Sequence, residues 1–249
     1  MSKVIAIFGA GTGLGVSMAR RFGREGFRVA LVARRPERLE ALVAELAADG
    51  IESAAFPADL SVPESVPVVV SSIREHFGRI DVVEYGPVPA GQGFVSATKL
   101  TATMLEELLP LFLLTPVELA QAVLPEMIER GDGAFLLTQG FSAVMPAPHF
   151  SGPGPIMSAA RNYLYSLNGE LAGTGVYAGT LAVAAGIARS ENAPVKPEGA
   201  DDAGAFEGVE FPVVDPDDIA NRYWEMYTDR QQVEAVFPDM SLAQGSPVA

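Results

Sequence analysis

The sequence predicts an α/β protein with a doubly wound parallel sheet, a Rossmann-type three-layer sandwich in which residues 1–249 form a single domain. Short apolar runs rich in β-branched residues alternate along the chain with longer amphipathic runs, as in strand–helix–strand units. Runs as apolar as Phe135-Leu136-Leu137 indicate parallel strands that are buried on both faces. A glycine-rich turn at residues 9–15 joins the first strand segment to the first helical one.

The expected elements follow one another in order along the chain. Strands are predicted at residues 3–8, 28–33, 51–56, 80–84, 133–138, 176–184 and 232–236, and helices at 14–26, 36–48, 63–77, 100–129, 156–172 and 216–228. The last helix has the clearest start, because Asp215 suits an N-cap and Pro216 suits the first helical position.

Residues 190–212 interrupt this alternation with prolines, glycines and acidic residues that show no periodicity. The segment follows a strand, and ligands of doubly wound proteins bind at the carboxyl ends of the strands. We expect either a substrate-side loop or a solvated excursion without a role.

Composition excludes several classes of protein. The 249 residues hold no cysteine, which excludes disulfide scaffolds and zinc fingers, and no metal site is expected. A net charge of −14 disfavours binding to nucleic acid or anionic membranes. Met1-Ser2-Lys3 leads directly into a strand-like run rather than a signal peptide, so a cytoplasmic location is expected.

The glycine-rich turn is the first candidate ligand site. Between a strand and a helix, glycines allow a tight turn and close approach of a diphosphate to the helix N-terminus. The residues expected to contact a dinucleotide here are Gly9, Gly11, Thr12, Gly13, Leu14 and Gly15. The alternative is a tight turn in a fold that binds no nucleotide.

Two arginines follow the second strand and indicate which dinucleotide is bound. Arg34 and Arg35 stand where a protein specific for NAD(H) presents an acid to the ribose hydroxyls. Guanidinium groups instead hold a 2′-phosphate through charge-assisted hydrogen bonds. NADP(H) is therefore the predicted cofactor, with Thr12 as a further donor, unless both arginines only cap the strand end in solvent.

The chain resembles the short-chain dehydrogenase/reductase family, in its compact single-domain form, over nearly its whole length. The segments that carry the resemblance are residues 9–15, Ala58-Asp59-Leu60, Ile80-Asp81-Val82-Val83, Gln121 to Pro125 and Asp217 to Ala220. The resemblance implies that Asp59 and Leu60 lie at the adenine, that Gly86 follows the fourth strand and that Ser190 contacts the nicotinamide carboxamide or a phosphate. It also implies a homodimer or homotetramer formed through helices 100–129 and 156–172, although a wider core would explain the same apolar residues.

The family's Asn-Ser-Tyr-Lys tetrad has no counterpart in this sequence. An ungapped alignment places Phe112 at the Asn position, Gly140 at the Ser, Pro153 at the Tyr and Met157 at the Lys. No Tyr-x-x-x-Lys occurs anywhere in the chain, and the fourth-strand motif has become Tyr85-Gly86-Pro87-Val88. The active site is thus degenerate relative to the family.

Three polar side chains are weak candidates for the missing chemistry. Ser142 could polarise a carbonyl or satisfy its own turn, and His149 could exchange a proton, contact substrate or do neither. Arg161 lies one helical turn after Met157 and either partly replaces the lysine charge or pairs with an acid across an oligomer interface. Tyr85 either flanks the cofactor or packs in the core.

Three functions remain open at this stage. The first is an atypical oxidoreductase that reduces a small carbonyl or oxidises an alcohol with NADP(H). The second is an isomerase, lyase or cyclase that uses the same crevice without net redox change. The third is an NADP(H)-binding protein without turnover.

Overall fold

The computed structural model describes residues 2–89, 91, 93–191 and 212–239. In this part of the chain seven parallel strands form one sheet in the order β3-β2-β1-β4-β5-β6-β9. Their bounds are β1 Val4–Phe8, β2 Arg28–Ala33, β3 Ser53–Pro57, β4 Val82–Tyr85, β5 Gly133–Gly140, β6 Val176–Val183 and β9 Glu234–Phe237. The predicted doubly wound parallel sheet is confirmed.

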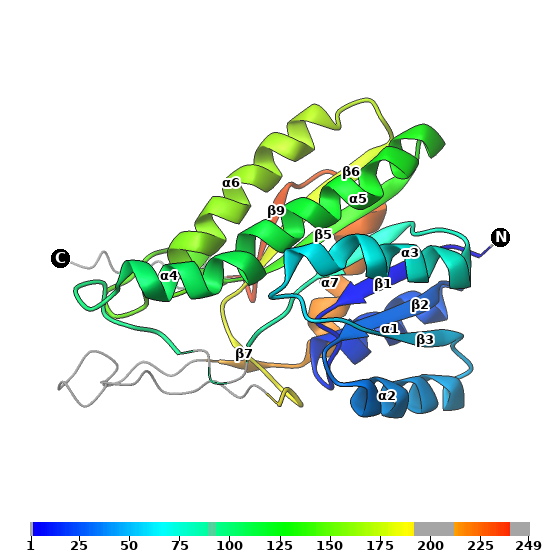
Figure 1. The fold of residues 1–249 in the computed structure, drawn as a ribbon, viewed down its shortest axis with the longest axis horizontal. Helices are drawn as coiled ribbons and strands as arrows, with labels where there is room; N and C mark the ends of the chain where they lie inside the picture. Colours follow the sequence, from blue (N-terminus) through cyan, green and yellow to red (C-terminus); the bar gives the residue numbers. More distant parts are fainter. Residues whose placement is uncertain (1, 90, 92, 192–211, 240–249) are drawn as a thin grey trace.

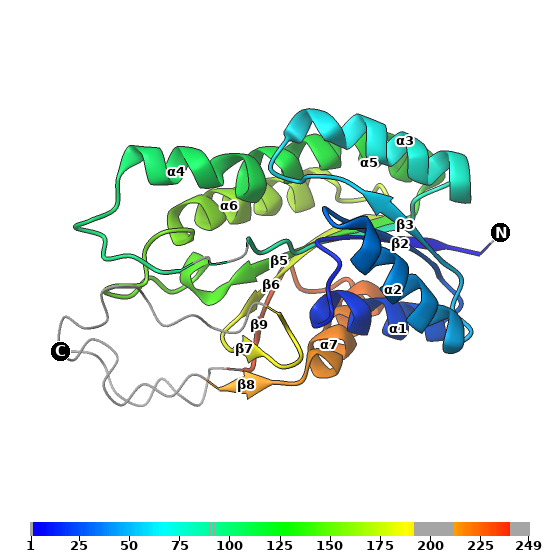
Figure 2. The ribbon, with the colours of Figure 1, turned by 60° about the horizontal axis from the view of Figure 1, so that its bottom comes forward.

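Helices cover both faces of the sheet, as Figures 1 and 2 show. The helices are α1 Leu14–Arg24, α2 Pro36–Ala48, α3 Val66–Phe77, α4 Ala102–Leu109, α5 Thr115–Arg130, α6 Gly154–Glu170 and α7 Pro216–Asp229. One apolar cluster joins the sheet to α3, α5 and α6, and a second joins the opposite face to α1, α2 and α7. The sheet is thus the middle layer of three.

The helical stretch predicted at 100–129 is present as Ala102–Arg130, but it contains a π-helical turn that the sequence analysis did not predict. A π-helical turn, Pro110–Leu114, separates α4 from α5. Pro116 has no N–H to donate to the carbonyl of Leu111 in the π-helical pattern. The Tyr85 hydroxyl donates to that carbonyl instead, at 2.5 Å, so the core tyrosine satisfies the break.

The start of α7 is as the sequence predicts. The backbone N–H of Asp217 donates to the Asp215 carboxylate at 2.8 Å, which makes Asp215 the N-cap. α6 begins at Gly154, two residues before the predicted start, and this places Pro153 at its N-cap.

The segment predicted as a loop, residues 190–212, lies outside the described residues except for its two ends. A short parallel ribbon brings these ends together, because β7 (Gly186–Ile187) pairs with β8 (Val213–Val214). The ribbon was not expected from the sequence. It fixes the point where the segment leaves and rejoins the domain.

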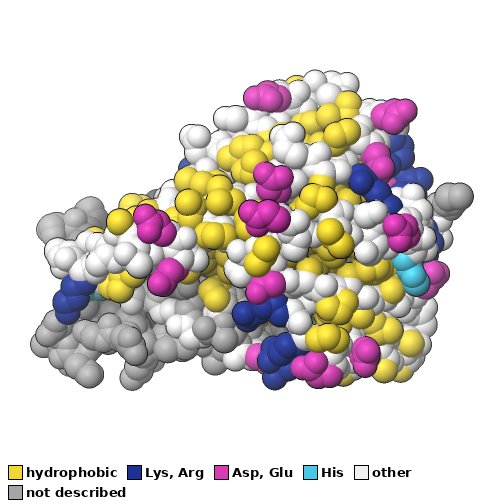
Figure 3. All heavy atoms as spheres, viewed as in Figure 1, with side chains coloured by type: hydrophobic (Ala, Val, Ile, Leu, Met, Phe, Trp, Pro, Cys, Tyr) yellow, Lys and Arg dark blue, Asp and Glu magenta, His cyan; other side chains and the backbone are white. Residues whose placement is uncertain are grey.

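Among the described residues, the stretch Ala102–Arg130 is the one helical region that matches a membrane span in length and apolar composition. It packs on the sheet, with Leu119, Ala120 and Met127 fully buried. Hydrophobic side chains also gather on the outer surface of the face that carries α5 and α6 (Figure 3).

Candidate functional site

The candidate crevice lies at the carboxyl ends of β1 and β4. These two strands are neighbours at the centre of the sheet, and the strand order runs outward from them in opposite directions. Such a switch point is where doubly wound proteins bind their ligands. The glycine turn of residues 9–15 follows β1 and lies at this point.

Gly9 is required by the backbone. Its φ is +100°, and a Cβ on it would lie 2.6 Å from the Cα of Pro87. The amides of Gly9 and Ala10 donate to the Val32 carbonyl at 2.9 and 3.0 Å, which fixes the turn against β2. Gly15 is equally confined, because its Cβ would lie 2.8 Å from the Cα of Ala10.

The start of α1 can receive an anion. Gly13 is its N-cap, no described side chain caps it, and its first turn holds no acidic residue. The positive end of the helix therefore faces the crevice without a counter-charge from its own sequence. Leu14 is the first helical residue, and a Cβ on Gly11 would meet only the Gly9 carbonyl oxygen, at 3.9 Å.

Arginines surround the carboxyl end of β2. Arg35 and Arg38, at the start of α2, both form ion pairs with the carboxylate of Glu191, the former at 2.9 Å. Arg34 lies near Asp59 after β3. Hydrogen bonds from the Ser61 hydroxyl and amide, with a smaller contribution from the charge of Arg34, hold the pKa of Asp59 below its ordinary value.

Arg38 and Glu191 were missed by sequence reasoning. The Arg35-x-x-Arg38 spacing at a helix start, which puts both side chains on one side of the first turn, was the available signal.

Leu60, beside Asp59, is buried, and its carbonyl accepts a hydrogen bond from the Thr115 hydroxyl at 2.8 Å.

Gly86 continues the crevice floor after β4. Its N–H donates to the Phe8 carbonyl at 2.9 Å. A Cβ on Gly86 would lie 2.6 Å from the Glu84 carboxyl oxygen Oε1, so a larger residue would clash there.

Ser142 carries an unusual hydroxyl. Its Oγ is buried, yet it has no hydrogen-bond partner among the described residues. A Cβ on Gly140, at the end of β5, would lie 3.9 Å from this Oγ and 3.6 Å from the Met157 sulfur. Because buried polar atoms normally have a partner, the Ser142 hydroxyl has unused hydrogen-bonding capacity, and it packs beside Gly154 at the start of α6.

His149 lies on the exposed segment that leads to α6, with a φ of 66°. Next to it, the ring of Phe150 contacts that of Phe94 at a centroid distance of 4.9 Å, and Ser151 pairs with Val95 as an isolated bridge. Two segments far apart in sequence thus form a rim, and His149 adjoins it.

Arg161 does not point to the crevice. Its guanidinium forms two hydrogen bonds with Glu234, the first residue of β9, and packs on the Tyr165 ring. Glu234 is in register with Thr180, three residues before the end of β6, which is roughly 10 Å from the carboxyl edge. The hypothesis that Arg161 replaces the missing lysine charge is therefore not supported, and Arg161 pairs with an acid of its own chain rather than with one across an oligomer interface.

Tyr85 packs in the core rather than lining the crevice. It is 2% exposed, donates to Leu111 as described above, and burial raises its pKa well above the ordinary value. Such a phenol keeps its proton at physiological pH.

Glu84 is a buried acid that sequence reasoning missed. Its carboxylate accepts a hydrogen bond from the Thr138 hydroxyl at 2.6 Å, and Thr138 is 2.6 Å from the Tyr223 hydroxyl of α7. Burial raises the pKa of Glu84 to about 7. An acid within the apolar run of a central strand was the signal in the sequence.

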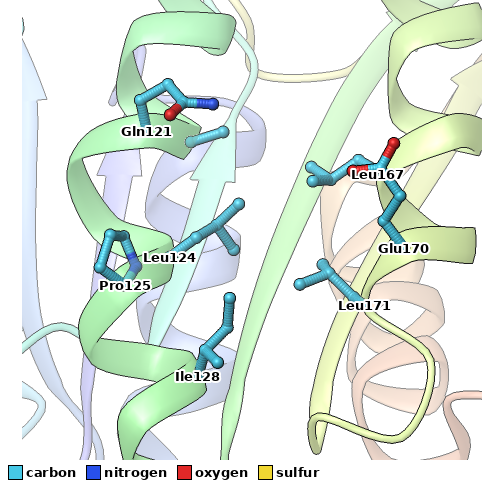
Figure 4. A pocket seen from close by; sticks show the side chains of 8 residues that line it. Gln121, Leu124, Pro125, Ile128, Leu167, Glu170 and Leu171 are labelled. Carbon is cyan, nitrogen blue, oxygen red and sulfur yellow. The ribbon is translucent and has the colours of Figure 1, made fainter.

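Two further features lie outside the crevice. No group of three or more His, Asp or Glu side chains in the described part of the chain could hold a metal. A groove of about 250 Å³ separates α5 from α6 (Figure 4), lined by Ala120, Gln121, Leu124, Pro125, Ile128, Leu167, Glu170 and Leu171. It lies near the amino ends of the strands, because Leu171 follows α6 and precedes β6.

Comparison with known proteins decides the family. The sequence profile described as short chain dehydrogenase matches residues 3–198. The chain belongs to the short chain dehydrogenase family. A short chain dehydrogenase of Pseudocercospora fijiensis is 29% identical over 174 residues, which cover 70% of this chain and 56% of that protein. This chain spans little more than half the length of two curated relatives that it matches.

Solved structures of short chain dehydrogenases share this fold. One from Streptomyces avermitilis has a TM-score of 0.83 and 25% identity, covering 98% of this chain and 90% of its own. A short-chain dehydrogenase from Sphingobium yanoikuyae in complex with NADPH has a TM-score of 0.78 and 26% identity, covering 97% of this chain and 90% of its own.

The structure brings together three positions that the resemblance assigns to the short chain dehydrogenase tetrad. Phe112 and Met157 belong to one apolar cluster, which also holds Ala143 and Ile156. Gly140 lies beside Met157, because a Cβ built on Gly140 would be 3.6 Å from the Met157 sulfur. The Gln139 side chain donates to the Met157 carbonyl at 2.7 Å and holds α6 to β5. This wall of the crevice is apolar, and the Ser142 hydroxyl adjoins it.

Proposed function

We propose that this chain is an NADP(H)-dependent oxidoreductase that acts on a small carbonyl or alcohol substrate without the tyrosine and lysine typical of its family. The unpartnered Ser142 hydroxyl carries this proposal, because it lies at the same end of the sheet as the glycine turn. The residues that would hold the dinucleotide fit it: the uncapped start of α1 suits a diphosphate, and Arg34, Arg35 and Arg38 suit a 2′-phosphate.

Each side chain has a stated part in carbonyl reduction. When bound, NADPH supplies the hydride. The Ser142 hydroxyl donates a hydrogen bond to the substrate oxygen, which stabilises the negative charge that develops there. The apolar cluster around Met157 excludes water from that wall. We assign His149 as the proton source, since histidine is the side chain that most often transfers protons in catalysis.

Ser142→Ala is expected to lower kcat/KM about 10²-fold, the typical loss for one hydrogen-bond donor to a developing oxyanion. The assay follows NADPH absorbance with a panel of small aldehydes and ketones, and His149→Gln is measured beside it. The control is Ser166→Ala, which makes the same substitution at an exposed serine of α6. Unchanged turnover in both site variants removes these two assignments.

A binding protein without turnover is the second candidate, favoured by the apolar residues at three tetrad positions. It predicts that NADPH binds but is not oxidised with any member of the panel. Product formation without a change in NADPH absorbance instead indicates an isomerase, lyase or cyclase.

Arg34→Ala is expected to weaken NADPH binding about tenfold and to leave NADH binding unchanged, because only NADPH carries the 2′-phosphate. Titration calorimetry measures both constants. Arg24→Ala removes an exposed arginine at the far end of α1 and is the control for net charge. Equal weakening of both nucleotides contradicts the assignment of the 2′-phosphate to Arg34.

We also infer a homodimer or homotetramer in which α5 and α6 of one copy cover those of another. Ile128 on α5 and Tyr165 on α6 are 44% and 40% exposed, and Leu114, just before α5, is 42% exposed. Ile128 also lines the groove of Figure 4. Ile128→Glu is expected to yield monomers in light scattering, whereas Val68→Glu on α3 keeps the wild-type mass. A monomeric wild type overturns this inference.

The expected cytoplasmic location remains a prediction that cell fractionation can check.

A further inference from the structure

A short strap, residues 189–191, crosses the candidate nucleotide site. The Thr12 hydroxyl donates to the Arg189 carbonyl at 2.8 Å, and Ser190 lies over Gly13, whose Cβ would come within 3.2 Å of the Ser190 Cα. The strap ends at Glu191, whose carboxylate pairs with Arg35 and Arg38. It therefore connects the starts of α1 and α2.

The first residue of the strap, Arg189, is held at the start of α7 by ion pairs. The Arg189 guanidinium contacts the Asp215 carboxylate at 2.7 and 3.1 Å and that of Asp217 at 3.2 Å. The φ of Arg189 is 61°, a left-handed conformation that turns the chain sharply toward the glycine turn. Two ion-paired ends thus hold Ser190 against the start of α1.

The chemistry of the Glu191 contact matches that of a nucleotide phosphate. A carboxylate and a phosphate both accept paired hydrogen bonds from guanidinium groups, but a phosphate monoester carries about −1.5 to −2 charges and three acceptor oxygens. We propose that Glu191 is a specificity residue of the nucleotide site. It occupies Arg35 and Arg38 when no nucleotide is bound, the 2′-phosphate of NADP(H) displaces it, and the neutral 2′-hydroxyl of NAD(H) does not.

This inference rests on the proposed function, which places the 2′-phosphate at these arginines. The exposure of the side chains sets the size of the effect. Arg35, Arg38 and Glu191 are 55%, 45% and 42% exposed, and exposed ion pairs are weak. Displacement of Glu191 therefore reduces NADP(H) affinity by a modest factor and does not block binding.

The test is titration calorimetry of NADPH and NADH against the wild type, Glu191→Gln and Glu37→Gln. Glu191→Gln is expected to tighten NADPH binding about threefold to tenfold and to leave NADH binding unchanged. Glu37 is an exposed acid in the first turn of α2, beside the arginines, so Glu37→Gln controls for the loss of one negative charge. It is expected to alter NADPH binding less than twofold.

Three results overturn the role of Glu191 while the proposed function stands. Weaker NADH binding by Glu191→Gln makes Glu191 a ligand of the ribose hydroxyls, as acids are in NAD-specific proteins. An equal gain in Glu37→Gln reduces the effect to general charge, and unchanged NADPH binding leaves Glu191 without influence. If neither nucleotide binds to the wild type or to Glu191→Gln, the proposed function itself fails.

Discussion

Glu84→Gln is expected to be about 3 kcal/mol more stable than the wild type near pH 8, while the two proteins unfold with similar free energies near pH 4. Folding buries this carboxyl, and its pKa rises from 4.5 to about 7. Between these values the native state binds more protons than the unfolded state. The stability contributed by Glu84 therefore falls as pH rises from about 4.5 to 7 and is constant above that range.

Chemical denaturation across this pH range measures the effect. Glutamine has the size of the protonated acid and can accept the Thr138 hydrogen bond, but it does not titrate. Subtracting the two stability curves cancels the carboxyls whose pKa values are lowered on folding, such as Asp59 and Asp132. Glu40→Gln, at an exposed position on α2, is expected to show no such difference. If the free energies of unfolding of Glu84→Gln and the wild type differ by the same amount at every pH, Glu84 is not a buried acid that titrates in this range.

Gly13→Ala is expected to weaken both NADPH and NADH by at least about tenfold, because both nucleotides carry the diphosphate that the start of α1 would bind. The φ and ψ of Gly13, −89° and −112°, lie outside the regions that other residues prefer. A methyl group there would also lie 3.1 Å from the Ser190 Cβ, which crowds the contact between residues 189–191 and the start of α1. Titration calorimetry with both nucleotides measures the loss.

Gly169→Ala is the control for Gly13→Ala. It makes the same substitution in α6, where a Cβ meets no atom within 4 Å. Circular dichroism must show that Gly13→Ala remains folded. If folded Gly13→Ala binds both nucleotides as the wild type does, the diphosphate does not lie at the start of α1.

Local signals in the sequence predict much of this fold. The Asp215-Pro216 start of α7 and the glycine turn after β1 depend on residues within a few positions of one another, and each forms as expected. The π-helical turn at Pro110–Leu114 has a local cause in Pro116, but the hydroxyl that satisfies the free Leu111 carbonyl comes from Tyr85 on β4. Sequence patterns do not reveal such distant partners.

The site shows the same limit. The sequence places Gly140 and Ser142 at the end of a strand. Only the structure shows that α6 buries the Ser142 hydroxyl and that no described group pairs with it. Arg161 pairs with Glu234 and Glu191 with Arg38, in each case across the fold. The pKa of Glu84 depends on its burial beneath α7, which the composition of one strand cannot specify.

The central claim is that the crevice binds NADP(H), and titration of NADPH and NADH into the wild-type protein tests it most directly. The predicted result is saturable heat from NADPH, with NADH binding at least about tenfold more weakly because it lacks the 2′-phosphate. The contradicting result is the absence of saturable heat from either nucleotide at millimolar concentration, with the protein shown to be folded in the same buffer.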